Sequence, residues 1–273
     1  MEPTVLYEVK DKAACITLNP PDVLNALNPP MYRELNDAYR RAEADPNVWV
    51  LIITGNGRAL SSGVDVSYMK TKDSQEDSTK NVMLDEPYLG SFLQWEAPQE
   101  LTPPYLEMTK PIICAVNGIC AGAGLDLVTT TDIVIASEDA TFFDPHTSIG
   151  IVSGREMVRM ARVMPLTATL RMALMGKHER MSAQRAYELG LVTEVVSKEK
   201  LMERALEIAA VICRNSPLAV RGTRLGIRKG LSLPINEAEL LAENYREKVT
   251  KSEDSLEGPA SFLEGRDPVW KGR

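Results

Sequence analysis

The stretch that decides the fold is Asn117-Gly118-Ile119-Cys120-Ala121-Gly122-Ala123-Gly124-Leu125-Asp126, which directly follows the apolar run Pro111–Val116. A short, continuous apolar run of this kind is typical of a strand that is buried on both faces. The small residues after it let a ligand approach the main chain, and a helix that begins there leaves unpaired N–H groups. Such a turn can cradle a phosphate or an oxyanion, and it equally suits close packing of a helix on a sheet.

A second turn of the same character is Arg58-Ala59-Leu60-Ser61-Ser62-Gly63-Val64-Asp65-Val66, shortly after the apolar run Val48–Thr54. The turn that begins at Asn117 lacks the Lys-Ser/Thr pair of a P-loop and the third glycine of a dinucleotide-binding fingerprint. Strands that alternate with helical segments and end in Gly-rich turns predict an α/β layered core.

The flanking segments extend this α/β pattern toward the N-terminus. Val5–Val9 and Ala13–Leu18, separated by three polar residues, predict a two-stranded hairpin. The segment from Pro30 to Ala44 places its apolar residues on one face of a 3.6-residue period, which predicts a helix. A further buried strand is expected at Ile133–Ala136, after Asp132.

From Ser153 onward the pattern is mainly helical. The predicted helices are Ser153–Val163, Leu166–Met175, Ser182–Leu189, Lys198–Arg214 and Ile235–Thr250. Ser182 suits a helix N-cap and Gly190 a helix end. The last amphipathic segment, Leu256–Trp270, is expected to dock on a subunit or on its own core. We therefore divide the chain into an α/β core at residues 1–195 and a C-terminal helical region at residues 196–273.

Composition excludes several classes of protein. The 273 residues carry 31 Lys+Arg and 38 Asp+Glu, a net charge of −7, so we expect no nucleic-acid partner. The four cysteines are too scattered for a disulfide scaffold or a zinc site, and only two histidines, His146 and His178, are present. The sequence has neither a signal peptide's apolar run nor the ~18 apolar residues of a membrane span. We expect a cytoplasmic protein with no metal site and no membrane partner.

Several stretches, taken together, resemble the enoyl-CoA hydratase/isomerase (crotonase) superfamily. In chain order they are Leu18-Asn19-Pro20-Pro21…Leu24-Asn25-Ala26-Leu27, Ser61-Ser62-Gly63-Val64-Asp65, Lys110-Pro111…Asn117-Gly118…Ala121-Gly122-Ala123-Gly124, Ala140-Thr141-Phe142 with Gly150-Ile151, and Met181-Ser182-Ala183…Ala186…Gly190-Leu191-Val192. The resemblance implies a spiral of ββα units with a C-terminal helical trimerisation region. It also implies an acyl-CoA substrate, no cofactor beyond the CoA of that substrate, and a homotrimer or a dimer of trimers.

The resemblance places the thioester carbonyl in an oxyanion hole made by the main-chain N–H groups of Val64 and Ala123. Preorganised donors favour an enolate that forms only as the reaction proceeds, and one such donor can be worth ~3–4 kcal/mol. The other implied contacts hold CoA largely through main-chain atoms. These residues are Asn25, Ala26, Ala59, Ser61, Gly63, Asp65 and Gly122. For Asp65, a role in organising the loop is at least as good an interpretation.

The chain departs from a standard hydratase at the acid/base pair. The family places two glutamates around one water, and the corresponding positions here hold Asp126 and His146. Asp126 is one methylene shorter than glutamate, and catalytic geometry is sensitive to such a change; its alternative role is a helix-N-terminal acid. An unperturbed pKa near ~6.5 lets His146 act as acid or base at neutral pH. Its alternative role is a packed histidine at a strand end.

Glu156 is a further candidate, because some relatives place an alternative carboxylate shortly after the segment corresponding to Gly150-Ile151. Ser153-Gly154-Arg155-Glu156 also has the spacing of a capping box, and we favour that interpretation. Asp144 is a weaker candidate beside His146. His178 lies in a polar segment and is expected at the surface.

The favoured function is hydration of a 2-enoyl-CoA or the reverse dehydration, with Asp126 and His146 handling water and proton. His146 keeps two reactions on the same scaffold open: hydrolytic or retro-Claisen cleavage, and a double-bond shift. A non-catalytic acyl-CoA-binding or RNA-binding protein is the remaining class, and the negative charge speaks against RNA. The segment Lys70–Thr109 is expected to form a lid and to shape the acyl pocket.

Overall fold

The computed structural model describes residues 3–65 and 108–273. The predicted lid, Lys70–Thr109, lies outside the described residues except for its last two. In the described part, no helix is long and apolar enough to cross a membrane.

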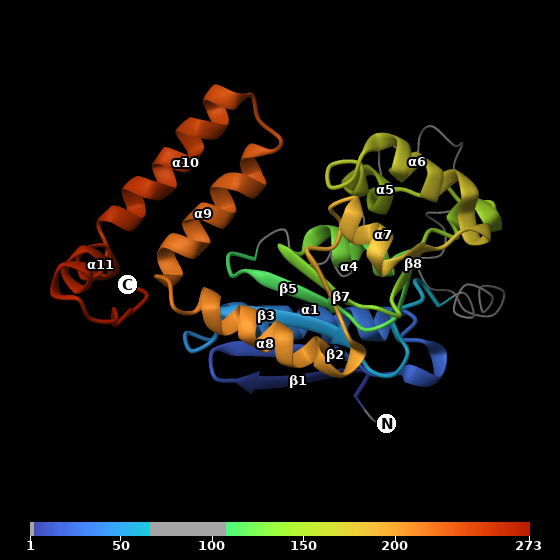
Figure 1. Cartoon of the computed structure of the whole chain (residues 1–273), viewed down its shortest axis with the longest axis horizontal. Helices are drawn as coiled ribbons and strands as arrows, with labels where there is room; N and C mark the ends of the chain where they lie inside the picture. Colours follow the sequence, from blue (N-terminus) through green and yellow to red (C-terminus); the bar gives the residue numbers. More distant parts are fainter. Residues whose placement is uncertain (1–2, 66–107) are drawn as a thin grey trace, which may run out of the picture.

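A six-stranded sheet forms the centre of the molecule (Figure 1). Its strands, in spatial order, are β1 (Val5–Lys10), β2 (Ala13–Leu18), β3 (Val50–Gly55), β5 (Ile112–Val116), β7 (Ile133–Ser137) and β10 (Glu194–Val196). β1 and β2 form the predicted antiparallel hairpin, and all pairs from β2 onward are parallel. Every residue of β3 and β5 is buried, as their continuous apolar runs predict.

A smaller second sheet contains the Gly-rich turns. Its order is β4 (Ala59–Ser61), β6 (Ile119–Ala121), β8 (Thr141–Phe143) and β9 (Met181–Ser182). β4, β6 and β8 each follow a strand of the large sheet after a tight turn, and the helix α4 (Gly124–Thr130) follows β6. This repeated step from one sheet to the other, with a helix after it, confirms the predicted α/β class and ββα spiral.

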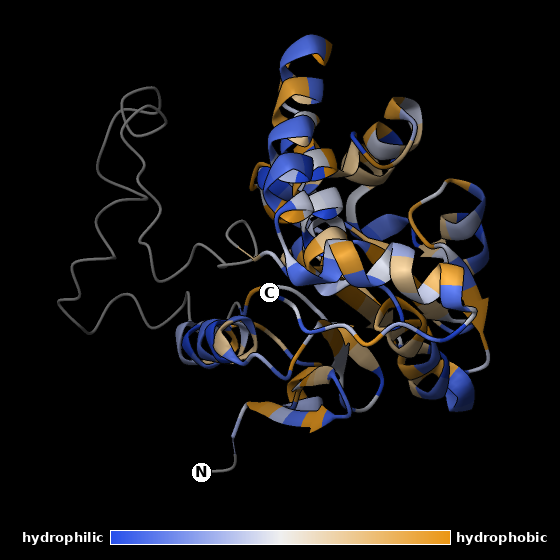
Figure 2. Cartoon of the chain, turned by 90° about the vertical axis from the view of Figure 1, so that its left-hand side faces the viewer, coloured by the Kyte–Doolittle hydropathy of each residue, from blue (hydrophilic) through white to orange (hydrophobic). Residues whose placement is uncertain are grey.

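Helices cover both faces of the large sheet. α1 (Pro29–Ala44) packs in the cluster that contains Leu51 and Ile53, whereas α8 (Leu201–Ile212) packs in the one that contains Val50 and Ile52. This division follows from the alternation of side chains along β3. Figure 2 shows the strands between these helices in hydrophobic colours.

The remaining helices lie toward the C-terminus and beside the second sheet. They are α5 (Arg155–Met160), α6 (Leu166–Met175), α7 (Ala183–Glu188), α9 (Pro217–Gly230), α10 (Ile235–Thr250) and α11 (Glu253–Glu264), with short 3₁₀ turns η1 (Pro21–Val23), η5 (His146–Ile149), η6 (Gly176–His178) and η7 (Lys198–Lys200). α6 and α10 match the predicted bounds, and Ser182 caps α7 as expected. α9 was not among the predicted helices, and its glycines weaken helix propensity. Those glycines bring α9 close to Ala238 and Ala242 of α10.

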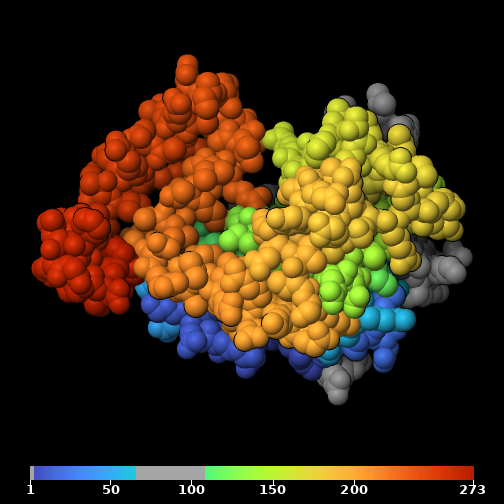
Figure 3. All heavy atoms as spheres, viewed as in Figure 1, coloured from blue at the N-terminus to red at the C-terminus, as the bar shows by residue number. Residues whose placement is uncertain are grey.

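The C-terminal tail docks on its own chain, one of the two outcomes expected for this segment. The Asp254 carboxylate accepts hydrogen bonds from the main-chain N–H groups of Lys271 and Gly272, and Trp270 Nε1 donates to Arg214 O. In Figure 3 the helices α9–α11, coloured orange to red, form the left of the molecule, and Arg162, just after α5, donates a hydrogen bond to Leu231 O at the end of α9. β10 crosses the predicted boundary at residue 195, and α8 packs on the large sheet although it follows that boundary. The division into a core at residues 1–195 and a helical region at residues 196–273 stays a prediction.

A buried lysine joins the end of α1 to the start of β5. Lys110 is fully buried, and its Nζ donates hydrogen bonds of 2.6 Å each to the carbonyl oxygens of Ala42 and Asp45. These carbonyls belong to the C-terminal end of α1, where helical carbonyls lack intrahelical partners and favour a positive charge. Lys110 therefore caps α1 from the neighbouring strand.

We predict that Lys110→Met lowers the free energy of unfolding by about 2 kcal/mol or more. Each hydrogen bond from a charged donor is worth ~1.5–3 kcal/mol, and part of the loss is offset because a charge is no longer buried. Urea denaturation measures the change. The exposed Lys200→Met serves as the control and should change the free energy by less than about 0.5 kcal/mol. Equal effects of the two variants would contradict the capping role.

Candidate active site

The two Gly-rich turns lie against each other because β4 and β6 pair in parallel. Gly63 has φ +96°, a conformation that residues with a side chain rarely adopt. A Cβ at Gly63 would lie 3.0 Å from Ala121 O and 3.3 Å from Ala123 N. The main chain of the first turn is therefore in close contact with the N–H group of Ala123 in the second turn.

Among the described residues, no acceptor is bound to the main-chain N–H groups of Val64 and Ala123. Leu27 N donates to Gly63 O at 2.8 Å and Asp65 N donates to Leu27 O at 2.9 Å, so Val64 lies between two bonded peptides with its own N–H turned away. Ala123 is the N-cap of α4, where N–H groups have no intrahelical acceptor. Within residues 3–65 and 108–273, neither N–H has a protein acceptor. Two adjacent free donors of this kind meet the requirement of an oxyanion hole.

Buried side chains hold the first turn in place. Asn25 is fully buried, and its Nδ2 donates to Asn56 O at 3.0 Å and to Ala59 O at 2.7 Å. Ser61 is also fully buried; its hydroxyl donates to Asn25 O and accepts from Gly63 N. The side chains of Asn25 and Ser61 thus position the turn.

The other residues with a predicted role in CoA binding lie in the same two turns, except Ala26, whose neighbour Leu27 is hydrogen-bonded to the first turn. Ala26, Ala59 and Gly122 are buried, and Asp65 is half-buried with its main-chain N–H bonded to Leu27 O. Gly122 has φ +51°, and a Cβ there would lie 3.7 Å from His146 Cε1. The imidazole of His146 therefore lies beside the turn that presents Ala123.

Three titratable side chains gather next to this turn: Asp126 in the first turn of α4, His146 at the start of η5, and Glu156 in the first turn of α5. They are close enough to act on one another electrostatically. Glu156 raises the pKa of both Asp126 and His146, and Asp126 also raises that of His146. The fold therefore brings together all three predicted acid/base candidates from separate elements.

Asp126 is bound by two arginines of α5. Arg159 Nη1 lies 2.9 Å from its Oδ1 and Arg155 Nη2 lies 3.6 Å from its Oδ2. Burial, followed by the charge of Glu156, raises the pKa of Asp126 to about 6, although both arginines oppose this rise. Its carboxylate is thus buried and already engaged, which limits its freedom to serve as a base.

Glu156 is not part of a capping box, and that prediction is wrong. α5 has Gly154 as its N-cap and no side chain caps it, so the spacing is displaced by one residue. The Ser153 hydroxyl lies instead by the Asp144 carboxyl, whose pKa it helps to lower. Glu156 is only 7 % exposed, and no described residue forms a hydrogen bond or ion pair with it. Its charge acts on both Asp126 and His146, and this side chain is therefore a candidate for a functional group.

His146 is bound by Asp144, two residues earlier. The Nδ1 atom of His146 forms a short hydrogen bond with Asp144 Oδ1, and the main-chain N–H of His146 donates to the same oxygen at 3.3 Å. The bond to Asp144 is the largest influence on His146 and raises its pKa, against the effect of burial. His178, by contrast, is exposed, as predicted.

Sequence reasoning missed Arg155 and Arg159. Their spacing of four residues on a predicted helix is a signal that they share one face. The sequence contains no indication that this face meets Asp126, because α4 and α5 come together only through packing.

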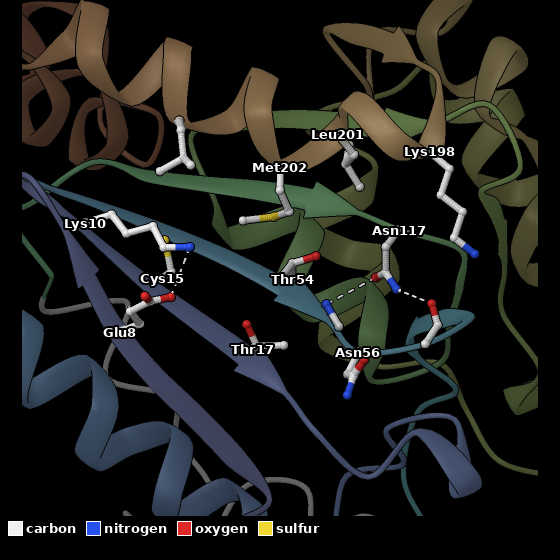
Figure 4. A pocket seen from close by; sticks show the side chains of 13 residues that line it. Glu8, Lys10, Cys15, Thr17, Thr54, Asn56, Asn117, Lys198, Leu201 and Met202 are labelled. Carbon is white, nitrogen blue, oxygen red and sulfur yellow. Dashed lines mark hydrogen bonds and ion pairs between the residues drawn. The ribbon is translucent and has the colours of Figure 1, made fainter.

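A separate cavity of about 330 Å³ lies between the first three strands and α8 (Figure 4). Its lining includes Glu8, Lys10, Cys15, Thr17 and Asn117, and none of the predicted site residues. Asn117 belongs both to the lining of this cavity and to the second turn. Its Oδ1 accepts a hydrogen bond from Gly55 N, and its Nδ2 donates to Gly57 O and Ala59 O. The Asn117 side chain, in the wall of this cavity, therefore stabilises the first turn.

The ββα spiral and the two facing turns define the class of crotonase-type acyl-CoA enzymes. The family model for enoyl-CoA hydratase/isomerase matches residues 8–273, so the chain belongs to the enoyl-CoA hydratase/isomerase family. The chain is 31 % identical to the 2,3-dehydroadipyl-CoA hydratase of Escherichia coli K12, with 97 % of each chain covered. It is 33 % identical to the carnitinyl-CoA dehydratase of Salmonella heidelberg, with 94 % of each covered.

A solved structure of an enoyl-CoA hydratase/isomerase from Mycobacterium paratuberculosis is 59 % identical to the chain. It superposes with a TM-score of 0.89 and 99 % of each chain is covered. A second, the enoyl-CoA hydratase from Bacillus anthracis, is 27 % identical with a TM-score of 0.85. These likenesses extend over the whole chain, including the C-terminal helices.

We predict that Gly63→Ala lowers kcat by about 10²–10³-fold, because the added methyl group would press on Ala123 N and displace one donor. Gly190→Ala is a matched control. Gly190 also has a positive φ, of +83°, but the nearest atom to its Cβ position is 3.9 Å away and it lies outside the two turns. Steady-state kinetics on crotonyl-CoA compares the two variants. An equal loss of kcat in both would show backbone strain rather than a damaged oxyanion hole.

Proposed function

We propose that this protein hydrates a 2-enoyl-CoA, or dehydrates the corresponding 3-hydroxyacyl-CoA. The observation that carries the proposal is the pair of free main-chain donors, Val64 and Ala123, beside a buried group of acid/base side chains. The related proteins named as a hydratase and a dehydratase both add or remove water, which supports the same reaction here.

In the proposed mechanism, the N–H groups of Val64 and Ala123 bind the thioester oxygen and stabilise the enolate. Glu156 accepts a proton from the attacking water, and His146 supplies a proton to the α-carbon. Asp126, held by Arg155 and Arg159, shapes the electrostatic field rather than moving a proton. This assignment differs from the expectation that Asp126 and His146 act as the pair, because no cation among the described residues is bound to Glu156, whereas Arg155 and Arg159 bind Asp126.

A second candidate function is hydrolysis of a thioester or of a β-diketone. The pairing of His146 with the buried Asp144 favours it, because a carboxylate-bound imidazole is a common activator of water. The products separate the possibilities: hydration adds one water to the acyl-CoA, hydrolysis of the thioester releases a free CoA thiol, and a double-bond shift leaves the mass unchanged.

We further propose a homotrimer or a dimer of trimers, in the cytoplasm. Large apolar side chains of the C-terminal helices are exposed in the single chain, which supports association; they include Ile235, Leu240, Leu256, Phe262 and Leu263. The free, mostly buried cysteines are consistent with a reducing compartment. The proposed proton chemistry requires no metal or redox group, and CoA enters as part of the substrate.

We predict that His146→Gln and Glu156→Gln each lower kcat for crotonyl-CoA hydration by about 10²–10⁴-fold, the usual value of a general acid or base. Asp126→Asn should lose less, because its carboxylate is already bound to Arg159. Loss of the enone absorbance measures the rate, and mass analysis identifies the product.

Two exposed residues provide the controls. His178→Gln and Glu203→Gln, the latter in the first turn of α8, should retain the wild-type rate. Full activity of Glu156→Gln together with inactivity of Asp126→Asn would reverse the roles assigned to these two carboxylates. Release of a CoA thiol by the wild-type protein, with no hydrated product, would favour the hydrolase.

A further inference from the structure

We propose that Asp144 is the positioning residue of His146: its Oδ1 holds Nδ1–H, so that Nε2 carries the proton delivered to the substrate. This inference rests on the proposed function for the proton transfer, but the pairing itself can be tested without turnover.

The backbone between the two residues fixes the pair. Asp144 follows β8 directly, Pro145 locks the next φ at −82°, and His146 begins η5. The same Asp144 oxygen receives both the main-chain N–H and the Nδ1 of His146. Two bonds to one oxygen leave the imidazole little freedom to turn over, and they direct Nε2 away from Asp144.

Burial makes the pairing necessary. Asp144 is 0 % exposed, and its Oδ2 accepts no hydrogen bond within the described residues. A buried carboxylate is costly unless it is paired, and the cationic partner that the described residues provide is His146. Burial by itself would raise the pKa of Asp144, but the hydrogen bonds from His146, helped by the nearby Ser153 hydroxyl, outweigh it and lower the pKa. Asp144 thus stays charged and favours the imidazolium.

The other charged groups around His146 act in the same direction or cancel. Glu156 of α5 and Asp126 of α4 both raise the pKa of His146, after the larger effect of Asp144. Arg155 and Arg159 of α5 bind Asp126 and so offset its charge. With the family's glutamate replaced, Asp144 supplies the negative charge that favours the protonated form of His146.

The proton balance of hydration assigns each group one transfer. Water loses a proton to Glu156 as its oxygen bonds to C3, and the Nε2–H bond of His146 breaks as C2 gains its hydrogen. Glu156 is then protonated and His146 neutral, with Nδ1–H still bound to Asp144. Transfer of one proton from Glu156 through water to Nε2 restores the starting state.

The first test is histidine-selective NMR titration of the whole protein. The chain has two histidines, so His178→Gln assigns the remaining signal to His146. We expect His146 to titrate above its ordinary pKa and, once neutral, to keep its proton on Nδ1. Asp144→Asn should move this midpoint down by about one pH unit or more, whereas the exposed Asp139→Asn should leave it unchanged. A neutral wild-type His146 with its proton on Nε2 would overturn the proposal, even if Asp144→Asn did not fold.

The second test is the pH profile of kcat/KM for crotonyl-CoA. Because His146 must be protonated to act as the acid, its pKa sets the alkaline limb of the profile. We expect Asp144→Asn to shift that limb to lower pH and to reduce kcat by about 10²–10⁴-fold with KM nearly unchanged. A residue that only stabilises the fold would lower the melting temperature and leave the limb in place, which contradicts positioning. If NMR shows the expected titration of His146 but the protein does not hydrate crotonyl-CoA, the proposed function is wrong and the pairing of Asp144 with His146 is supported.

Discussion

The parallel pairing of β4 with β6 is the contact on which the site depends. It brings two segments that are about sixty residues apart in the chain into contact at Gly63 and Ala123, with no room for a side chain between them. The close approach explains why both turns consist of small residues. It also fixes two main-chain donors before any substrate binds, and preorganised donors of this kind stabilise charge without the cost of reorganisation during the reaction. The large sheet and the side chains of Asn25 and Asn117 support this contact from below.

The three carboxylates around the donors differ in the partner that neutralises their charge. Asp126 is bound by Arg155 and Arg159, Asp144 is bound by His146, and Glu156 has no bound cation among the described residues. Burial gives these differences their weight, because charges interact more strongly when water is excluded. Acid/base side chains with different partners differ in proton affinity. A reaction with one proton donor and one proton acceptor requires such a difference.

The α5 helix shows how local sequence can mislead. Ser153 and Glu156 have the spacing of a capping box, yet the helix begins one residue later, and the two side chains face the site rather than each other. Packing of α5 against α4 brings Arg155 and Arg159 onto Asp126, a contact between elements that the local spacing does not indicate. The turn that precedes the helix therefore serves the site.

The sequence by itself determined the α/β class, the buried strands β3 and β5, the helices α6 and α10, and the position of the two Gly-rich turns. These features depend on local periodicity and on residues without side-chain bulk, which leave a clear pattern in the chain. Only the tertiary structure decided which carboxylate is free and which is paired, that α9 forms a helix, and where the tail docks. These outcomes depend on contacts between distant segments: the neighbours of Asp126 and Glu156 come from other elements, and no local pattern records which side chains will share a buried space.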